Sequence, residues 1–204
     1  MSTLPTEDIL DAGRWIDAQG WCPATGGNFS QRSGDNAALI TASGRHKGHL
    51  TGQDLLRVDL EGRVLDSDLR PSAETLLHCC LYRLDAGIGA VLHTHSVNST
   101  VLSRLTAGDW LEIEGFEMQK SLSGNLTHDE AIRIALFDNT QDMQALAAAV
   151  TERWDQAPLS WGLLVRGHGL YAWGRDMNEA RRHLEGLEFL FACVLEMKRL
   201  GAPV

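Results

Sequence analysis

Three histidines in this chain are spaced so that their side chains could hold one metal ion. His93 and His95 close the apolar stretch 90–95 with a single residue between them. In a strand, the two-residue period of the side chains places both imidazoles on one face, about two residue rises apart. His168 lies between two glycines and two further apolar runs, a context typical of a tight turn that aims one side chain. Three neutral imidazoles that leave one position open are the ligand pattern of catalytic zinc.

The first two histidines alone are explained equally well without a metal. A strand that ends in two hydrogen-bonded histidines would show the same spacing. The third imidazole favours the metal, and we therefore predict a zinc site formed by His93, His95 and His168.

Two loops of small residues are suited to bind a phosphate group. The adjacent glycines in the stretch 24–30 can expose consecutive backbone N–H groups as an anion nest, although a turn between a helix and a strand explains them as well. The stretch 42–48 combines a hydroxyl, a glycine and a cation.

A helix is predicted to begin in the stretch 70–74, with Ser72 as its N-cap and Glu74 in its first turn. Because a helix N-terminus attracts anions, Ser72 could cap the helix and contact a phosphate at once. Glu74 is a candidate acid or base, but a carboxylate in a first turn is also explained by the helix dipole alone.

A second candidate acid or base is Glu117, which lies between Phe116 and Met118. Large apolar neighbours tend to raise the pKa of a carboxyl group toward values useful for proton transfer. From periodicity alone, a surface carboxylate is the more common explanation of such a position. The local pattern therefore leaves both glutamates open as catalysts.

The elements that would position these residues are helices and strands of ordinary length. Helical periodicity is found at 6–20, 72–85, 98–105, 140–154 and 176–200. Strand-like runs are found at 39–41, 90–95, 111–113, 132–137, 161–165 and 170–173, and residues 55–65 are typical of a hairpin. We predict that residues 1–204 form a single domain.

The composition is that of an ordinary globular domain, with 204 residues, 44% of them hydrophobic and 22% charged. The chain has no apolar run of membrane-spanning length and no secretory signal pattern at its start, so we expect a cytoplasmic protein without a membrane partner. A formal net charge of −9 disfavours a nucleic acid partner, and it requires any bound phosphate to be held by local donors. The four cysteines form no C-x-x-C pair, which favours reduced thiols in the core.

Five stretches, in this order along the chain, resemble the class II aldolase and adducin head family. They are residues 25–30, 41–44, 71–74, 93–96 and 167–169, and together they span nearly the whole chain. The resemblance implies an α/β fold, a three-layer α/β/α domain around a mainly antiparallel central sheet. It also implies one zinc ion per subunit on the three histidines and assembly into a homotetramer.

The resemblance further implies a phosphate pocket. The family's pocket residues correspond here to Gly26, Gly27, Asn28, Ser43, Gly44, Lys47 and Ser72. Aldolases of the family usually carry a second serine where this chain has Ala73, so one hydroxyl of their phosphate geometry is missing.

Three further stretches, residues 116–120, 138–140 and 170–174, are similar to family members that remove water from a phosphorylated ketose. The proton beside a carbonyl leaves at neutral pH only if the developing enolate oxygen is neutralised, which zinc on three histidines does as a Lewis acid. A carboxylate must then take the proton and return it to the departing hydroxyl. Aldolases of the family use the glutamate that corresponds to Glu74, whereas the dehydratase likeness places the acid/base at Glu117. We favour Glu117 and expect Glu74 to stay ionised as a positioning or secondary acid/base group.

Alternative functions use parts of the same site. The metal and phosphate sites would equally serve an aldolase or epimerase that acts on a sugar phosphate. An adducin-like assembly domain without activity would lack the metal histidines present here. A zinc hydrolase or hydratase would not require the phosphate-type loops. The sequence as a whole favours dehydration of a small phosphorylated ketose.

Overall fold

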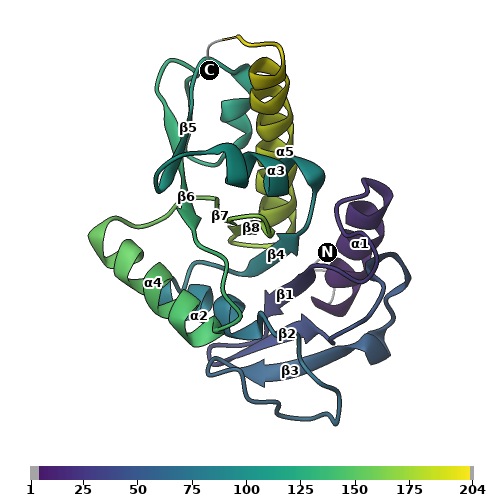
Figure 1. Cartoon of the computed structure of the whole chain (residues 1–204). Helices are drawn as coiled ribbons and strands as arrows, with labels where there is room; N and C mark the ends of the chain where they lie inside the picture. Colours follow the sequence, from purple (N-terminus) through teal and green to yellow (C-terminus); the bar gives the residue numbers. More distant parts are fainter. Residues whose placement is uncertain (1–4, 203–204) are drawn as a thin grey trace.

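The computed structural model of the chain describes residues 5–202 and contains one eight-stranded sheet. Its strands follow the order β3-β2-β1-β4-β8-β7-β6-β5 (Figure 1). They are β1 (Asn28–Arg32), β2 (Ala37–Thr41), β3 (Leu55–Asp59), β4 (Ala90–Thr94), β5 (Trp110–Ile113), β6 (Ile132–Phe137), β7 (Gly162–Val165) and β8 (Gly169–Gly174). Only the pair β6 and β7 is parallel, so the sheet is mainly antiparallel, as the family resemblance predicts.

Helices cover both faces of the sheet and complete the three layers. One face carries α1 (Pro5–Ala18), α3 (Val97–Leu105) and α5 (Met177–Arg199), and the other carries α2 (Thr75–Leu84) and α4 (Met143–Gln156). Three short 3₁₀ helices lie in loops: η1 (Lys47–His49), η2 (Gly52–Asp54) and η3 (Glu117–Ser121). The predicted α/β/α architecture is therefore confirmed.

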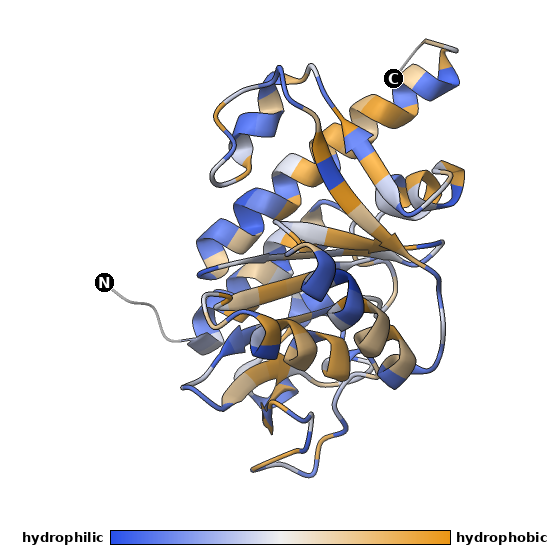
Figure 2. Ribbon diagram, turned by 90° about the vertical axis from the view of Figure 1, so that its left-hand side faces the viewer, coloured by the Kyte–Doolittle hydropathy of each residue, from blue (hydrophilic) through white to orange (hydrophobic). Residues whose placement is uncertain are grey.

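The strand period sorts the apolar side chains into two cores, one under each layer of helices. Along β4, Leu92 belongs to the core under α1, α3 and α5, and its neighbour Val91 belongs to the core under α2 and α4. The central strands are accordingly largely orange in Figure 2, while the helices alternate between blue and orange. His93 lies two residues after Val91 in the same strand, so its side chain points to the same face of the sheet, toward α2.

Two local predictions were wrong. The helix expected at Ser72 begins at Thr75, with Glu74 at the N-cap position, because residues 72–75 form a turn in which the Thr75 N–H donates to the Ser72 carbonyl. The second half of the predicted loop 24–30 belongs to β1, which pairs with β2 on one side and β4 on the other. The second difference arises because both partners of β1 are distant in sequence.

None of the helices in the part of the chain that the structure describes combines the length and the apolar character that a membrane crossing requires.

Candidate active site

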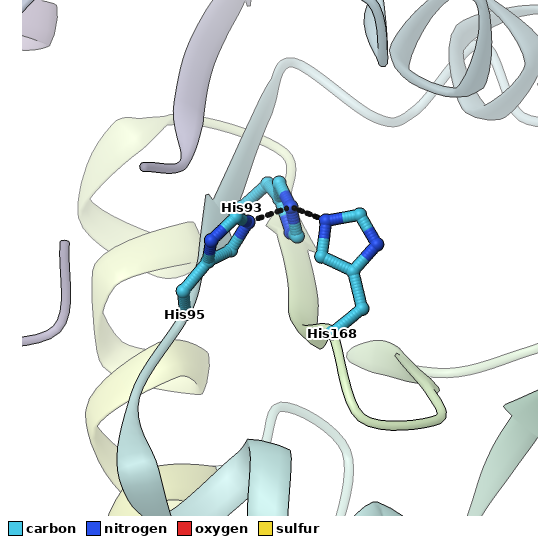
Figure 3. Close-up of side chains that lie close together, drawn as sticks. All are labelled: His93, His95 and His168. Atoms are coloured by element: carbon cyan, nitrogen blue, oxygen red, sulfur yellow. Dashed lines mark hydrogen bonds between the residues drawn. The ribbon is translucent and has the colours of Figure 1, made fainter. Parts of the chain in front are cut away.

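The three predicted metal ligands converge at the end of β4 (Figure 3). His93 lies in β4, and His95 follows one residue after the strand on the same side. His168 is in the turn between β7 and β8, which pairs with β4. The Nε2 atom of His93 is 2.9 Å from that of His95 and 3.3 Å from that of His168 (dashed lines in Figure 3).

The donors of this cluster fit a zinc ion. His93 Nδ1 is 3.0 Å from the Leu170 carbonyl oxygen, and His168 Nδ1 is 3.3 Å from the Asn139 amide oxygen. Both Nδ1 atoms therefore carry the proton, which leaves the two Nε2 lone pairs facing each other, a repulsive contact unless a cation lies between them. Tetrahedral zinc with Zn–N bonds of roughly 2.0–2.1 Å separates its nitrogen ligands by about 3.3 Å, close to the observed spacings.

The three imidazoles are neutral at pH 7, the form that binds metals. Burial, together with repulsion from the neighbouring His168, lowers the pKa of His95 to about 4. Burial also lowers the pKa of His93 well below its usual value, with added repulsion from the other two imidazoles. For His168, burial lowers the pKa, and the Glu74 carboxylate opposes part of that shift.

Two glycines let the β7–β8 turn approach the end of β4. Gly167 has φ +65°, a left-handed conformation that a turn before His168 requires. A Cβ atom at Gly169 would collide with the Thr94 carbonyl oxygen, so only glycine lets β8 start this close to β4. The sequence pattern Gly-His-Gly thus has a steric origin.

Glu74 faces the histidine cluster from the N-terminus of α2. Its Oε1 atom is 3.8 Å from His168 Nε2, and its Oε2 atom accepts hydrogen bonds from Ser72 Oγ at 2.5 Å and Asn28 Nδ2 at 2.8 Å. Burial raises the pKa of Glu74, but the hydrogen bond from Ser72, the backbone N–H and the nearby imidazole of His168 outweigh it, so the net pKa lies below the usual value. Glu74 is therefore an ionised carboxylate with one oxygen directed at the cluster.

A cavity of about 250 Å³ adjoins the histidines and collects nearly all the predicted phosphate ligands. It is bounded by the two glycine-containing loops, the turn before α2 and the side chain of His95. The predicted residues in its lining are Gly26, Gly27, Ser43, Gly44, Lys47, Ser72 and Glu74.

Lys47 supplies the cation of this cavity. Its side chain is 1% exposed, and Nζ donates to the carbonyl oxygens of Thr25 at 2.8 Å and Arg45 at 2.7 Å. Burial lowers the pKa of Lys47, and nearby Cys22 and Glu74 oppose part of the shift. Because an ammonium group has three donors, one donor remains for a ligand in the cavity.

Two predicted residues lie elsewhere. Asn28 does not line the cavity, because its amide is held by Ser72 and Glu74. Glu117 lies at the start of η3, where its side chain is 72% exposed and pairs with Lys120 at 2.9 Å and His128 at 3.4 Å. The prediction that Glu117 has an apolar environment is wrong, since Phe116 and Met118 pack on the core while the carboxylate between them points outward.

Asn139, a residue without a predicted role, fixes the tautomer of His168 through its amide oxygen. A signal for this residue was present. The parallel strands β6 and β7 end at the same edge, with Phe137 paired to Val165, so polar residues just beyond both ends must lie near one another. The partner of His93 is a backbone carbonyl, for which side-chain patterns carry no signal.

Comparison with known proteins places these features in a family. The sequence profile of the class II aldolase and adducin N-terminal domain matches residues 7–195. The chain is 55% identical over 194 residues to a methylthioribulose-1-phosphate dehydratase from Serratia proteamaculans, covering 95% of each chain. It is 56% identical, with the same coverage, to a protein of that name from Pectobacterium carotovorum.

The solved structure of L-fuculose-1-phosphate aldolase from Thermus thermophilus superposes on this chain with a TM-score of 0.78 and 28% identity. The superposition covers 98% of this chain and 97% of the aldolase. The chain thus belongs to the class II aldolase and adducin family.

Proposed function

We propose that this chain dehydrates 5-methylthioribulose 1-phosphate to 2,3-diketo-5-methylthiopentyl 1-phosphate, a step of methionine salvage. One observation supports the proposal: three histidines that could bind a metal lie next to an ionised glutamate and to a cavity with a buried lysine. Relatives that share more than half of their residues with the chain bear the name of this activity.

His93, His95 and His168 would hold one zinc ion per subunit through their Nε2 atoms. When bound, zinc supplies Lewis acidity that neutralises the negative charge developing on the substrate's carbonyl oxygen. The tautomers of His93 and His168 are already set for this role by the Leu170 carbonyl and by Asn139.

The cavity would bind the C1 phosphate and so orient the rest of the ketose toward the histidines. Lys47 provides a charge-assisted donor, and the loops 26–27 and 43–44 provide backbone N–H groups. Asn28 acts on Glu74 rather than on the phosphate, because its amide donates to that carboxylate.

Proton transfer from C3 to the departing C4 hydroxyl requires a carboxylate that can change its protonation state. Glu74 is poorly suited, since its low pKa and its hydrogen bonds from Ser72 and Asn28 hold it ionised. We keep Glu117 as the acid/base and infer that it serves the site of a neighbouring copy. The 3₁₀ helix that carries it is held against α5, because the Lys120 carbonyl accepts a hydrogen bond from the Arg182 guanidinium at 2.9 Å.

Glu117 can reach the site of another copy only if the chain self-associates, and we propose that it forms a homotetramer. The α3 helix begins just after His95 and carries an exposed apolar stripe, Val97 (75% exposed), Val101 (40%) and Leu105 (56%). Residues four apart share one face of a helix, so the three side chains form a continuous surface suited to contact with another copy. Val101 and Leu105 also line a groove of about 900 Å³ between α3 and α5.

The proposed reaction can be distinguished from aldol cleavage by its products. We expect that the zinc-loaded protein converts methylthioribulose 1-phosphate into a product lighter by one water, as read by mass spectrometry. Retro-aldol fragments instead would favour the aldolase alternative, which the position of Glu74 beside His168 supports. Unchanged substrate would contradict both.

Replacing Lys47 with alanine is expected to raise KM about ten- to a hundredfold and to change kcat much less, because a charge-assisted hydrogen bond contributes roughly 1.5–3 kcal/mol. Steady-state kinetics test this, with Arg63→Ala as the control for an exposed cation outside the cavity lining. Thermal unfolding must show that the Lys47 variant is folded, since this lysine is buried. An unchanged KM would remove Lys47 from the phosphate pocket.

A further inference from the structure

The ring of Tyr171 lies flat against the ring of His93. The two ring centroids are 3.8 Å apart, and the ring planes differ by 11°. The contact follows from strand register, because His93 in β4 is directly opposite Tyr171 in β8. Both side chains are fully buried, so the stack is part of the interior behind the histidine cluster.

Tyr171 is in turn supported from α2. The ring of His78 meets it edge-on, with centroids 5.8 Å apart and an angle of 70°. His78 is itself fixed, because its Nδ1 atom is 2.7 Å from Ser30 Oγ in β1. Burial lowers the pKa of His78 to about 3, with Glu74 opposing part of the shift, so this imidazole is neutral and places no charge behind the metal ligands.

The hydroxyl of Tyr171 has no hydrogen-bond partner among the residues that the structure describes. A buried hydroxyl without a partner lowers the stability of the fold, so any favourable contribution of Tyr171 comes from its aromatic ring. The ring restricts rotation of the His93 imidazole, while the Leu170 carbonyl sets its tautomer.

We propose that Tyr171 is a positioning residue for metal binding, whose ring holds His93 in the orientation that brings its Nε2 atom to His95 and His168. The proposal rests on the metal site of the proposed function. The stacked ring would also have an electrostatic effect. If the His93 imidazole took up part of the positive charge of a bound metal ion, the face of the Tyr171 ring would attract that charge.

The proposal is tested by metal affinity rather than by turnover. Zinc affinity is measured by competition with a chromogenic chelator, and the absorption spectrum of the Co²⁺-loaded protein reports ligand geometry. Tyr171→Leu is expected to weaken zinc binding about 10–100-fold, the range for loss of an outer-shell partner, and to change the Co²⁺ spectrum. Tyr171→Phe keeps the ring and is expected to bind zinc within about threefold of the unmodified protein.

Trp173→Leu is the matched control. Trp173 lies two residues further along β8 on the same face, is 4% exposed and packs on Trp154 instead of a metal ligand. This variant is expected to lower the unfolding temperature without changing zinc affinity. If Tyr171→Leu does not fold, Tyr171→Met, whose unbranched side chain adapts to the same space, takes its place.

The outcomes separate the inference from the proposed function. Equal zinc affinity in Tyr171→Leu and Trp173→Leu would overturn the positioning role while leaving the metal site intact. A weakened affinity in Tyr171→Phe would show that the hydroxyl, and not the ring, is responsible, and would also overturn it. An unmodified protein that binds no zinc would remove the proposed function and this inference together.

Discussion

Replacement of His95 by alanine is expected to empty the metal site and to abolish dehydration while the chain stays folded. Loss of a direct ligand leaves only two imidazoles, and the affinity should fall further than the roughly 10–100-fold caused by loss of an outer-shell partner. The fold should survive, because the His95 side chain borders a cavity and belongs to neither hydrophobic core. Zinc content per chain, measured after gel filtration, gives the readout, with circular dichroism as the test of folding.

His49→Ala is the control for this experiment, since His49 is exposed in η1 and lies outside the cavity lining. It should retain one zinc per chain and full activity. The same loss of zinc is expected for alanine at His93 and at His168, whose Nε2 atoms complete the cluster. Full zinc occupancy in His95→Ala would contradict the three-histidine site.

The three metal ligands could be predicted from sequence because each has a local signature, while their convergence depends on the pairing of β4 with β8. Alternation along a strand places His93 and His95 on one side whatever the rest of the fold does. The glycines around His168 are required by a turn with positive φ and by the close approach of β8 to Thr94, and both constraints leave a mark on the sequence. The two candidate phosphate-binding loops could be predicted for the same reason, since their glycines and lysine are local features of the sequence.

The environment of each carboxylate could not be predicted in this way. Glu117 has apolar sequence neighbours, yet its own side chain is exposed, because in a short 3₁₀ helix consecutive residues point in different directions. Glu74 is placed by a turn before α2 and by Asn28, a residue 46 positions away. The stack of Tyr171 on His93 depends on the register of β4 against β8, which no local pattern specifies.

Replacement of Glu117 by glutamine is expected to lower kcat by about 10²–10⁴-fold, the usual loss for a general acid/base, with zinc still bound. Glutamine keeps the shape of the side chain and removes its basicity, and Glu117 has no contact with the histidine cluster within its own chain. Turnover and zinc content are measured together. Glu112→Gln is the matched control, because Glu112 is exposed on β5 and pairs with Arg133 at 2.8 Å. Near-normal turnover in Glu117→Gln alongside collapse in Glu74→Gln would move the acid/base to Glu74 and the reaction toward aldol cleavage.

Mixed oligomers test whether Glu117 acts across a subunit boundary. A chain with His95→Ala keeps Glu117 but lacks a metal ligand, and a chain with Glu117→Gln keeps all three histidines. Each variant alone should be nearly inactive. When the two are co-expressed, sites that combine the histidines of one chain with Glu117 of the other become complete, so activity should return to a fraction of that of the unmodified protein. Recovery cannot arise if Glu117 serves its own chain, because then every site lacks either the metal or the acid/base. Co-assembled chains that remain inactive would therefore contradict a shared site.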